Sequence, residues 1–289
     1  MFLKHPDFSK NEPHSFLMLK KFCGCLLALL LVIPTFFAQN SSSPVYQLDW
    51  KIEAPLATSG ATLSLLGLAL SETIHPNTLQ EVNNLSQNQW LRMDKAATDN
   101  FSNAADHASD WLLKGSAAMP VLLMADPDIR QEASKIGVLL SESLLITNGL
   151  NTVTKRLMLR NRPYVYNPNV LAEQRTSIDA RLSFFSGHTA ATSCLSFFSA
   201  KVWSDYHPES RWKPVVWTAA AAVPAVTGYL RYKAGKHYFT DVAAGYAVGA
   251  LIGYFVPHLH KVDTRSRQKL RFSSGMIEDS PVMVVKYRF

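Results

Sequence analysis

Charged residues are scarce in this chain, and cysteines are scarcer. Asp, Glu, Lys and Arg together make up 18% of 289 residues, whereas hydrophobic residues make up 47%. A largely disordered chain needs more charge and fewer apolar residues, so this composition excludes disorder for most of the length. It predicts an extensive apolar interior, a membrane association, or both. The length suits one large domain or two small ones.

The three cysteines give little basis for a disulfide or a metal site. Cys23 and Cys25 lie in an apolar N-terminal run, and Cys194 stands alone. A chain cut after that run keeps one thiol, so we expect no internal disulfide. No His or further Cys lies near Cys23 and Cys25 to complete a zinc site.

The sequence also lacks the features of nucleic-acid binding proteins. It has no arginine-rich helix, no zinc-finger spacing and no basic run interleaved with aromatic residues, so we expect no nucleic-acid partner. The net charge of +7 suits anionic substrates or a lipid surface. For most of these charges, a solvated basic surface is the simpler interpretation.

An apolar run near the N-terminus predicts export. Residues 22–38, FCGCLLALLLVIPTFFA, follow two lysines and precede the polar stretch QNSSSP. This order is typical of a secretory signal, with cleavage expected after Ala38. The run is short for a membrane span, although an uncleaved signal anchor is the alternative. The preceding residues do not suit a signal, which suggests Met18 as the true start.

Apolar residues at helical spacing predict an all-α protein. We expect a helical bundle of about six core helices, with a short C-terminal β-hairpin or strand tail. The helix expected at 104–125 should break near Pro120, the next should follow the turn signal at 126–128, and the last should end at Pro257. The expected helices cover about 54–71, 104–125, 129–159, 187–203, 214–230 and 239–256.

The same pattern predicts four segments along the chain. Residues 1–38 form an N-terminal extension and signal peptide, and residues 39–109 an N-terminal helical segment. Residues 110–260 form the helical domain that carries the clusters described next, and residues 261–289 a basic C-terminal tail.

Three short clusters concentrate polar residues beside these apolar helices. Each has a plain structural explanation: a solvated helix end, where cations favour the helix dipole, a helix N-cap, and an ionic pair one helical turn apart. The clusters are KRLMLRNRP with Lys155 and Arg162, FFSGHTA with Ser186, Gly187 and His188, and RYKAGKHYFTD with Arg231, His237 and Asp241.

Taken together, the clusters describe a site for a phosphate group. Lys155, Arg162 and Arg231 supply three cations, and arginine forks match phosphate oxygens. Ser186 and Gly187 open a predicted helix, where N–H groups favour an anion. One histidine can attack phosphorus and the other can protonate the departing oxygen. His237 has Asp241 one turn away to orient it, so His237 suits the nucleophile and His188 the acid.

The pattern Lys-x6-Arg-Pro, Ser-Gly-His and Arg-x5-His-x3-Asp resembles the type 2 phosphatidic acid phosphatase family. Its superfamily includes bacterial acid phosphatases and vanadium haloperoxidases. The resemblance covers about residues 110–257. Two positions depart from the family pattern: Phe185 replaces a proline before Ser-Gly-His, and Leu230 replaces a serine before Arg231. Phe185 affects the geometry of the turn. Leu230 lacks the hydroxyl with which a serine could contact the phosphate.

The resemblance implies a metal-independent phosphatase with no cofactor. His237 would form a phosphohistidine, and His188 would protonate the leaving alcohol and then activate water. The substrate would be a phosphorylated lipid or a small phosphate ester, either a monoester or a diphosphate. Alternatives are a vanadium-dependent haloperoxidase using the same anion pocket, phosphotransfer to an acceptor other than water, and an anion-binding protein without turnover.

Two interpretations differ in whether the helices cross a membrane. Many relatives are six-span lipid phosphatases, but only four of the six expected helices here have charge-free runs near spanning length. With an N-terminal signal, six crossings would also place the site in the cytoplasm. We therefore favour an exported bundle, periplasmic or membrane-associated, with its active site outside the cytoplasm.

Overall fold

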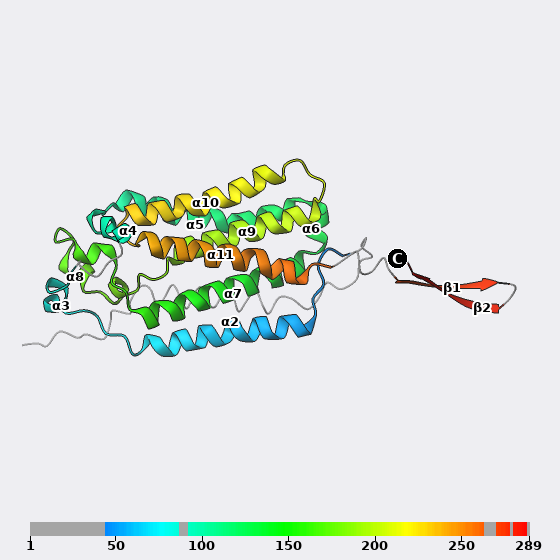
Figure 1. Ribbon diagram of the computed structural model, residues 1–289, viewed down its shortest axis with the longest axis horizontal. Coiled ribbons are helices and arrows are strands. Elements are labelled where there is room, and N and C mark those ends of the chain that lie inside the picture. Colours follow the sequence, from blue (N-terminus) through cyan, green and yellow to red (C-terminus); the bar gives the residue numbers. More distant parts are fainter. Residues whose placement is uncertain (1–43, 87–91, 263–269, 278–279, 288–289) are drawn as a thin grey trace, which may run out of the picture. The chain divides into compact units, whose positions relative to one another are not determined.

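The structure is a computed structural model that describes residues 44–86, 92–262, 270–277 and 280–287. The predicted signal peptide lies outside these residues. Within them the chain forms ten α-helices, and six long ones run side by side in a bundle (Figure 1). The long helices are α2 (Trp50–Ser71), α5 (Asn103–Leu122), α7 (Ala133–Met158), α9 (Gly187–Tyr206), α10 (Lys213–Lys233) and α11 (Phe239–His260).

The directions of the long helices bring distant parts of the sequence to one end of the bundle. Helices α5, α9 and α11 begin at the end where α7 and α10 finish (Figure 1). Two of the short helices, α3 (Leu79–Asn83) and α8 (Ala172–Arg175), lie at this end, as does α4 (Arg92–Lys95). All three predicted polar clusters fall on these helix ends or on the loops that join them.

Helix α9 is the centre of the bundle and packs against α5, α7, α10 and α11. Its contact with α11 depends on three glycines spaced four residues apart, which form one stripe on α11. A Cβ added at Gly245, Gly249 or Gly253 would lie 2.5, 2.1 or 2.4 Å from a carbonyl oxygen of α9 or of its N-cap. These glycines therefore let the two backbones touch, as small residues do in membrane helix pairs.

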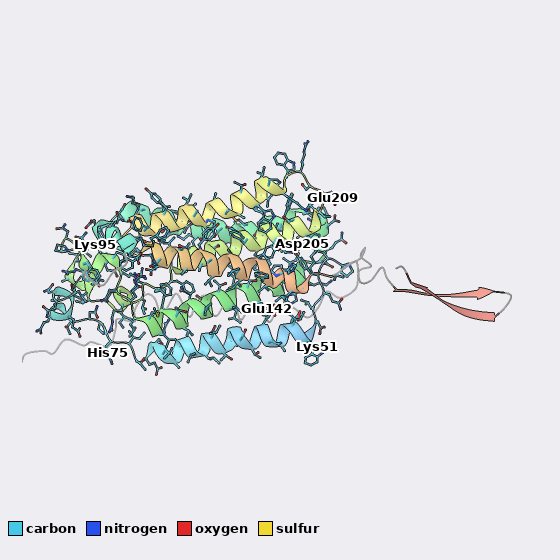
Figure 2. The ribbon with its side chains drawn as sticks, in the orientation of Figure 1. Lys51, His75, Lys95, Glu142, Asp205 and Glu209 are labelled. Carbon is cyan, nitrogen blue, oxygen red and sulfur yellow. The ribbon has the colours of Figure 1, made fainter. Side chains whose placement is uncertain are left out.

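Among the described residues, three helical segments are long and apolar enough to cross a membrane: α2, residues 133–166 and α11. A 22-residue helix is about 33 Å long, and the hydrocarbon core of a bilayer is about 30 Å thick. This finding supports a membrane protein over the bundle without crossings that the sequence favoured. Figure 2 shows Lys51, Asp205 and Glu209 at one end of the bundle and His75 and Lys95 at the other.

Two prolines do not end their helices as predicted. Helix α5 continues through Pro120 to Leu122, and α11 continues through Pro257 to His260. Both prolines lie in the last turn of their helix. A proline removes one backbone hydrogen bond, and this loss matters little where almost no helix follows. The turn signal at residues 126–128 instead opens a separate short helix, α6 (Pro127–Gln131), capped by the Asp126 carboxylate.

The predicted fold class needs a correction. Ten α-helices, rather than about six, account for the described part of the chain, and residues 44–86 and 92–262 contain no strand. The helical fold therefore includes no hairpin. The tail backbone is described as two antiparallel strands, β1 (Leu270–Ile277) and β2 (Ser280–Tyr287), which form a separate two-stranded sheet. The extra helices escaped prediction because one or two turns show no periodicity.

Candidate active site

His237 lies just before α11 and is almost fully buried, with 1% of its surface exposed. Burial lowers its pKa well below the ordinary value, and the charges of Arg162, Arg231 and Lys155 lower it further, as does His188. His237 thus lies within electrostatic range of the three predicted cations and of His188. The lowered pKa favours the neutral ring, the form that a nucleophile requires.

Asp241 lies behind His237 in the first turn of α11 and is fully buried. One carboxylate oxygen accepts hydrogen bonds from the Ser183 hydroxyl (2.5 Å) and from the Tyr238 N–H (3.0 Å), and lies 3.6 Å from His237 Nδ1. The other accepts from Arg160 Nη1 at 2.5 Å. Nδ1 has no hydrogen-bond partner within the described structure. Asp241 is therefore placed to orient His237, but at a distance longer than a hydrogen bond.

The Ser186-Gly187 turn is fixed against two neighbouring helices. The Ser186 N–H donates to the carbonyl of Asp241 at 3.0 Å, and the Asn151 side chain of α7 donates to the carbonyl of Phe185 at 2.8 Å. A Cβ at Gly187 would lie 2.9 Å from the Asn151 side-chain oxygen, so a larger residue does not fit without a shift. Ser186 caps α9, as predicted. The positive end of the α9 dipole thus points into the site.

Arg162 and Lys155 approach from the C-terminal end of α7. Arg162 is buried, and its guanidinium donates to the Asp179 carboxylate at 2.7 Å and to the Asp179 carbonyl at 2.9 Å. The pKa of the Asp179 carboxyl is lowered: burial opposes this shift, and the positive charge of Arg162 drives it. Lys155, in contrast, has no carboxylate within ion-pair distance among the described residues. Its amine is available to an incoming anion.

Arg231 ends α10 and is held by the first turns of α5. Its Nη1 donates to Asp106 at 2.5 Å and to the Ser109 hydroxyl at 3.2 Å. Lys236 contacts the other Asp106 oxygen at 3.2 Å. The Arg231 Nε is buried without a hydrogen-bond partner in the described structure. An unpaired buried donor is costly unless a ligand binds it.

A family model matches the part of the chain that carries the three clusters. The model of the PAP2 superfamily matches residues 136–265, which include all three clusters. The match confirms the resemblance that the three motifs carried.

Two individual proteins resemble the chain. It is 27% identical over 149 residues to the lipid A 4′-phosphatase of Porphyromonas gingivalis, covering 50% of this chain and 59% of that protein. The chain thus spans about three fifths of the length of that relative. A solved structure, a transmembrane PAP2 type phosphatidylglycerolphosphate phosphatase from Bacillus subtilis, is 23% identical with a TM-score of 0.45, covering 70% of this chain and 95% of that one.

Sequence reasoning missed a buried ionic network behind the candidate site. Arg160 pairs with Asp241 and, through Nη2 at 2.8 Å, with the fully buried Asp94. Asp94 also accepts from the Thr240 hydroxyl at 2.7 Å and the Thr240 N–H at 3.1 Å. Buried polar groups need hydrogen-bond partners, and the partners in this network hold the start of α11 in place. Nothing in the spacing of Asp94 indicates this contact 146 residues away.

Sequence reasoning also missed the carboxylate that faces His188. His188 Nε2 lies 2.8 Å from an oxygen of Asp110, which comes from α5. Burial lowers the pKa of His188 to about 4, and Arg231 adds to the shift, while Asp110 opposes it. The available signal was the pair Asp106 and Asp110, four residues apart on a predicted helix. Such a pair shares one face.

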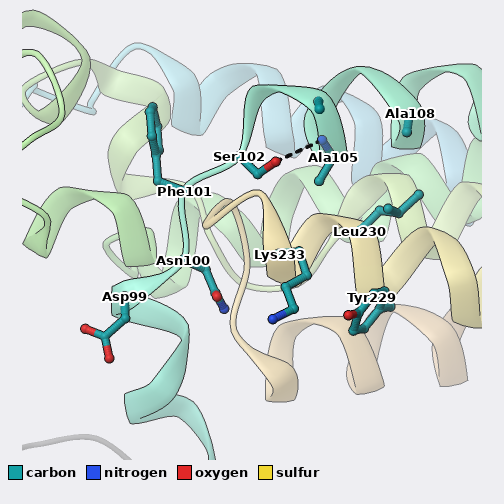
Figure 3. Close-up of a pocket in the computed structure, with 10 residues that line it drawn as sticks. Asp99, Asn100, Phe101, Ser102, Ala105, Ala108, Tyr229, Leu230 and Lys233 are labelled. Carbon is teal, nitrogen blue, oxygen red and sulfur yellow. Dashed lines mark hydrogen bonds between the residues drawn. The ribbon is translucent and has the colours of Figure 1, made fainter.

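Two cavities open beside the site. One, of about 590 Å³, lies between the N-terminal end of α5 and Tyr229, Leu230 and Lys233 of α10 (Figure 3). The other, of about 390 Å³, includes Asp179 and Lys236 in its lining. Phe101 lines both. Neither lining includes His188 or His237. Among the described residues no group of three or more His, Cys, Asp or Glu side chains is arranged to hold a metal ion.

Proposed function

We propose that this protein is a phosphatase that hydrolyses a phosphorylated lipid through a phosphohistidine on His237. One observation carries the proposal: the buried imidazole of His237 lies within the electrostatic reach of Lys155, Arg162 and Arg231. Preorganised cations of this kind stabilise the charge that spreads over phosphate oxygens in the transition state. The proposal extends to a phosphate monoester or a diphosphate.

In the first step, the neutral His237 attacks phosphorus with a ring-nitrogen lone pair. A phosphorus–nitrogen bond forms, the ester phosphorus–oxygen bond breaks, and the departing oxygen takes a proton from His188. Asp241, at 3.6 Å from Nδ1, favours the positive charge that develops on the His237 ring. The three cations and the N-terminus of α9 hold the phosphoryl oxygens.

In the second step, water attacks the phosphohistidine. His188, now neutral, accepts a proton from the water as its oxygen bonds to phosphorus. The phosphorus–nitrogen bond then breaks, which returns the electron pair to His237 and releases inorganic phosphate. His188 therefore acts as an acid in one step and as a base in the other, which requires its proton to exchange freely.

Three features support a lipid as the substrate. Three helices have spanning length and apolar composition, and the site lies at one end of them, where a lipid head group would be. Both relatives are named for activity on a phosphorylated lipid. Together, these features lead us to propose a membrane enzyme.

The test compares phosphate release by the full chain in detergent from phosphatidate, phosphatidylglycerophosphate and p-nitrophenyl phosphate. His237→Asn should abolish release and prevent acid-labile labelling of the protein by a 32P-labelled ester. The matched control is His107→Asn, because His107 is exposed on α5, and it should retain both.

Two results would contradict the proposal. Wild-type protein that releases phosphate from none of the three esters would refute the activity. Release that survives His237→Asn would refute the nucleophile while leaving a phosphatase in place. Faster turnover of p-nitrophenyl phosphate than of either lipid would argue against a lipid substrate only.

A further inference from the structure

The carboxylates of α5 stand against the catalytic cations from a helix outside the three motifs. Asp106, Ser109 and Asp110 lie three and four residues apart, so they share one face of α5 (Asn103–Leu122). Asp106 is paired with Arg231 at 2.5 Å and with Lys236 at 3.2 Å. Asp110 lies 3.9 Å from Arg231, a weaker contact, and 2.8 Å from His188 Nε2. The two aspartates therefore have different partners.

We infer that Asp110 is a positioning residue that sets the proton position and the orientation of His188 during catalysis. The inference rests on the proposed phosphatase function. A carboxylate accepts hydrogen bonds and does not donate them when ionised, so His188 must donate from Nε2. The neutral ring then carries its lone pair on Nδ1. Nδ1 is left to exchange the proton with the leaving oxygen and with water.

The charge of Asp110 also opposes the cations that surround His188. The groups that face His188 are Arg231 of α10, Lys155 of α7, His237 before α11, and Asp106 and Asp110 of α5. Burial, Arg231 and Lys155 all disfavour a protonated His188, whereas Asp110 favours it. Without this carboxylate, the acid form needed for the first step becomes rarer. Asp110 would act on His188 as the aspartate of a catalytic triad acts on its histidine.

This role makes a prediction that a merely structural role does not. An alkyl alcohol is a poor leaving group and needs its proton, whereas p-nitrophenolate leaves without one. Asp110→Asn keeps an oxygen that can accept from Nε2 but removes the charge. We expect kcat for an alkyl phosphate, such as phosphatidate, to fall about 10- to 100-fold. For p-nitrophenyl phosphate we expect a loss below about threefold.

The pH profile supplies the second measurement. With phosphatidate, the alkaline limb of kcat should move to lower pH in Asp110→Asn, because loss of the negative charge disfavours the His188 proton. Asp110→Glu retains the charge, so it should restore part of the activity and move the alkaline limb back toward its wild-type pH. The matched control is Asp128→Asn, because Asp128 is an exposed aspartate on α6. This variant should change neither kcat for the two esters nor the pH profile. The Asp110 side chain is 42% exposed, so its substitution should leave the fold intact.

The outcomes separate this inference from the function on which it rests. A wild type that hydrolyses no phosphate ester refutes the proposed function. If the wild type is active and Asp110→Asn lowers kcat equally for both esters, or for neither, the inference alone is overturned. An alkaline limb that stays in place in Asp110→Asn also overturns it.

Discussion

A single methyl group on α11 should separate the two halves of the active site. Gly249 lies in the middle of the glycine stripe, and a Cβ there would lie 2.1 Å from the carbonyl oxygen of Ala190 and 2.9 Å from the N–H nitrogen of Cys194. Ordinary carbon–oxygen contacts are about 3.3 Å. In Gly249→Ala, α9 and α11 must therefore move apart by about 1 Å, since neither backbone atom can give way.

The magnitude follows from what the two helices carry. His188 is in the first turn of α9, and Asp241 is in the first turn of α11, with His237 just before it. A 1 Å displacement of reacting groups costs on the order of 100-fold in rate, so we expect kcat to fall by about that factor. Overpacking costs about 1–3 kcal/mol of folding free energy. Replacing a helical glycine by alanine returns up to about 1 kcal/mol.

The assay measures phosphate release and the thermal unfolding midpoint in detergent. The matched controls are Gly115→Ala on α5 and Gly137→Ala on α7, where an added Cβ would meet nothing within 4 Å. These variants should keep wild-type activity and unfold at the same or a higher temperature. The reasoning would be refuted if Gly249→Ala matched them in both activity and midpoint.

Three further predictions concern charge. Lys155→Met should raise the inhibition constant of orthovanadate, a phosphate mimic, about 10- to 100-fold, because Lys155 has no ion pair in the described structure and is free to bind the anion; an unchanged constant would exclude it from the pocket. Arg160→Met should instead lower the unfolding midpoint as well as kcat, because it leaves the buried Asp241 short of a partner; loss of activity at an unchanged midpoint would contradict this. Finally, kcat/KM should decline as pH rises above about 4, the pKa of His188 in the empty site. The decline of kcat should lie at higher pH, since bound phosphate raises that pKa, and profiles in the reverse order would contradict the acid role.

Local signals identified much of the catalytic region. Ser186 was predicted to cap a helix because serine accepts from an N–H two or three residues on, and α9 does begin at Gly187. The six long helices were visible because three or more turns repeat an apolar period. Helices of one or two turns were missed for lack of any period to read, and the two prolines were misjudged because their cost depends on how much helix follows.

The sequence by itself predicted the candidate chemistry: three cations, two histidines and a carboxylate, at spacings that fit one phosphate group. Only the tertiary structure decided what stands around them. The expected boundary at residue 110 falls inside α5, and Asp110 meets His188 across 78 residues of sequence. Contacts of this kind arise where helices pack, and the strength of an ionic or hydrogen-bonded pair depends on distance and burial rather than on sequence separation. No local pattern could therefore have revealed them.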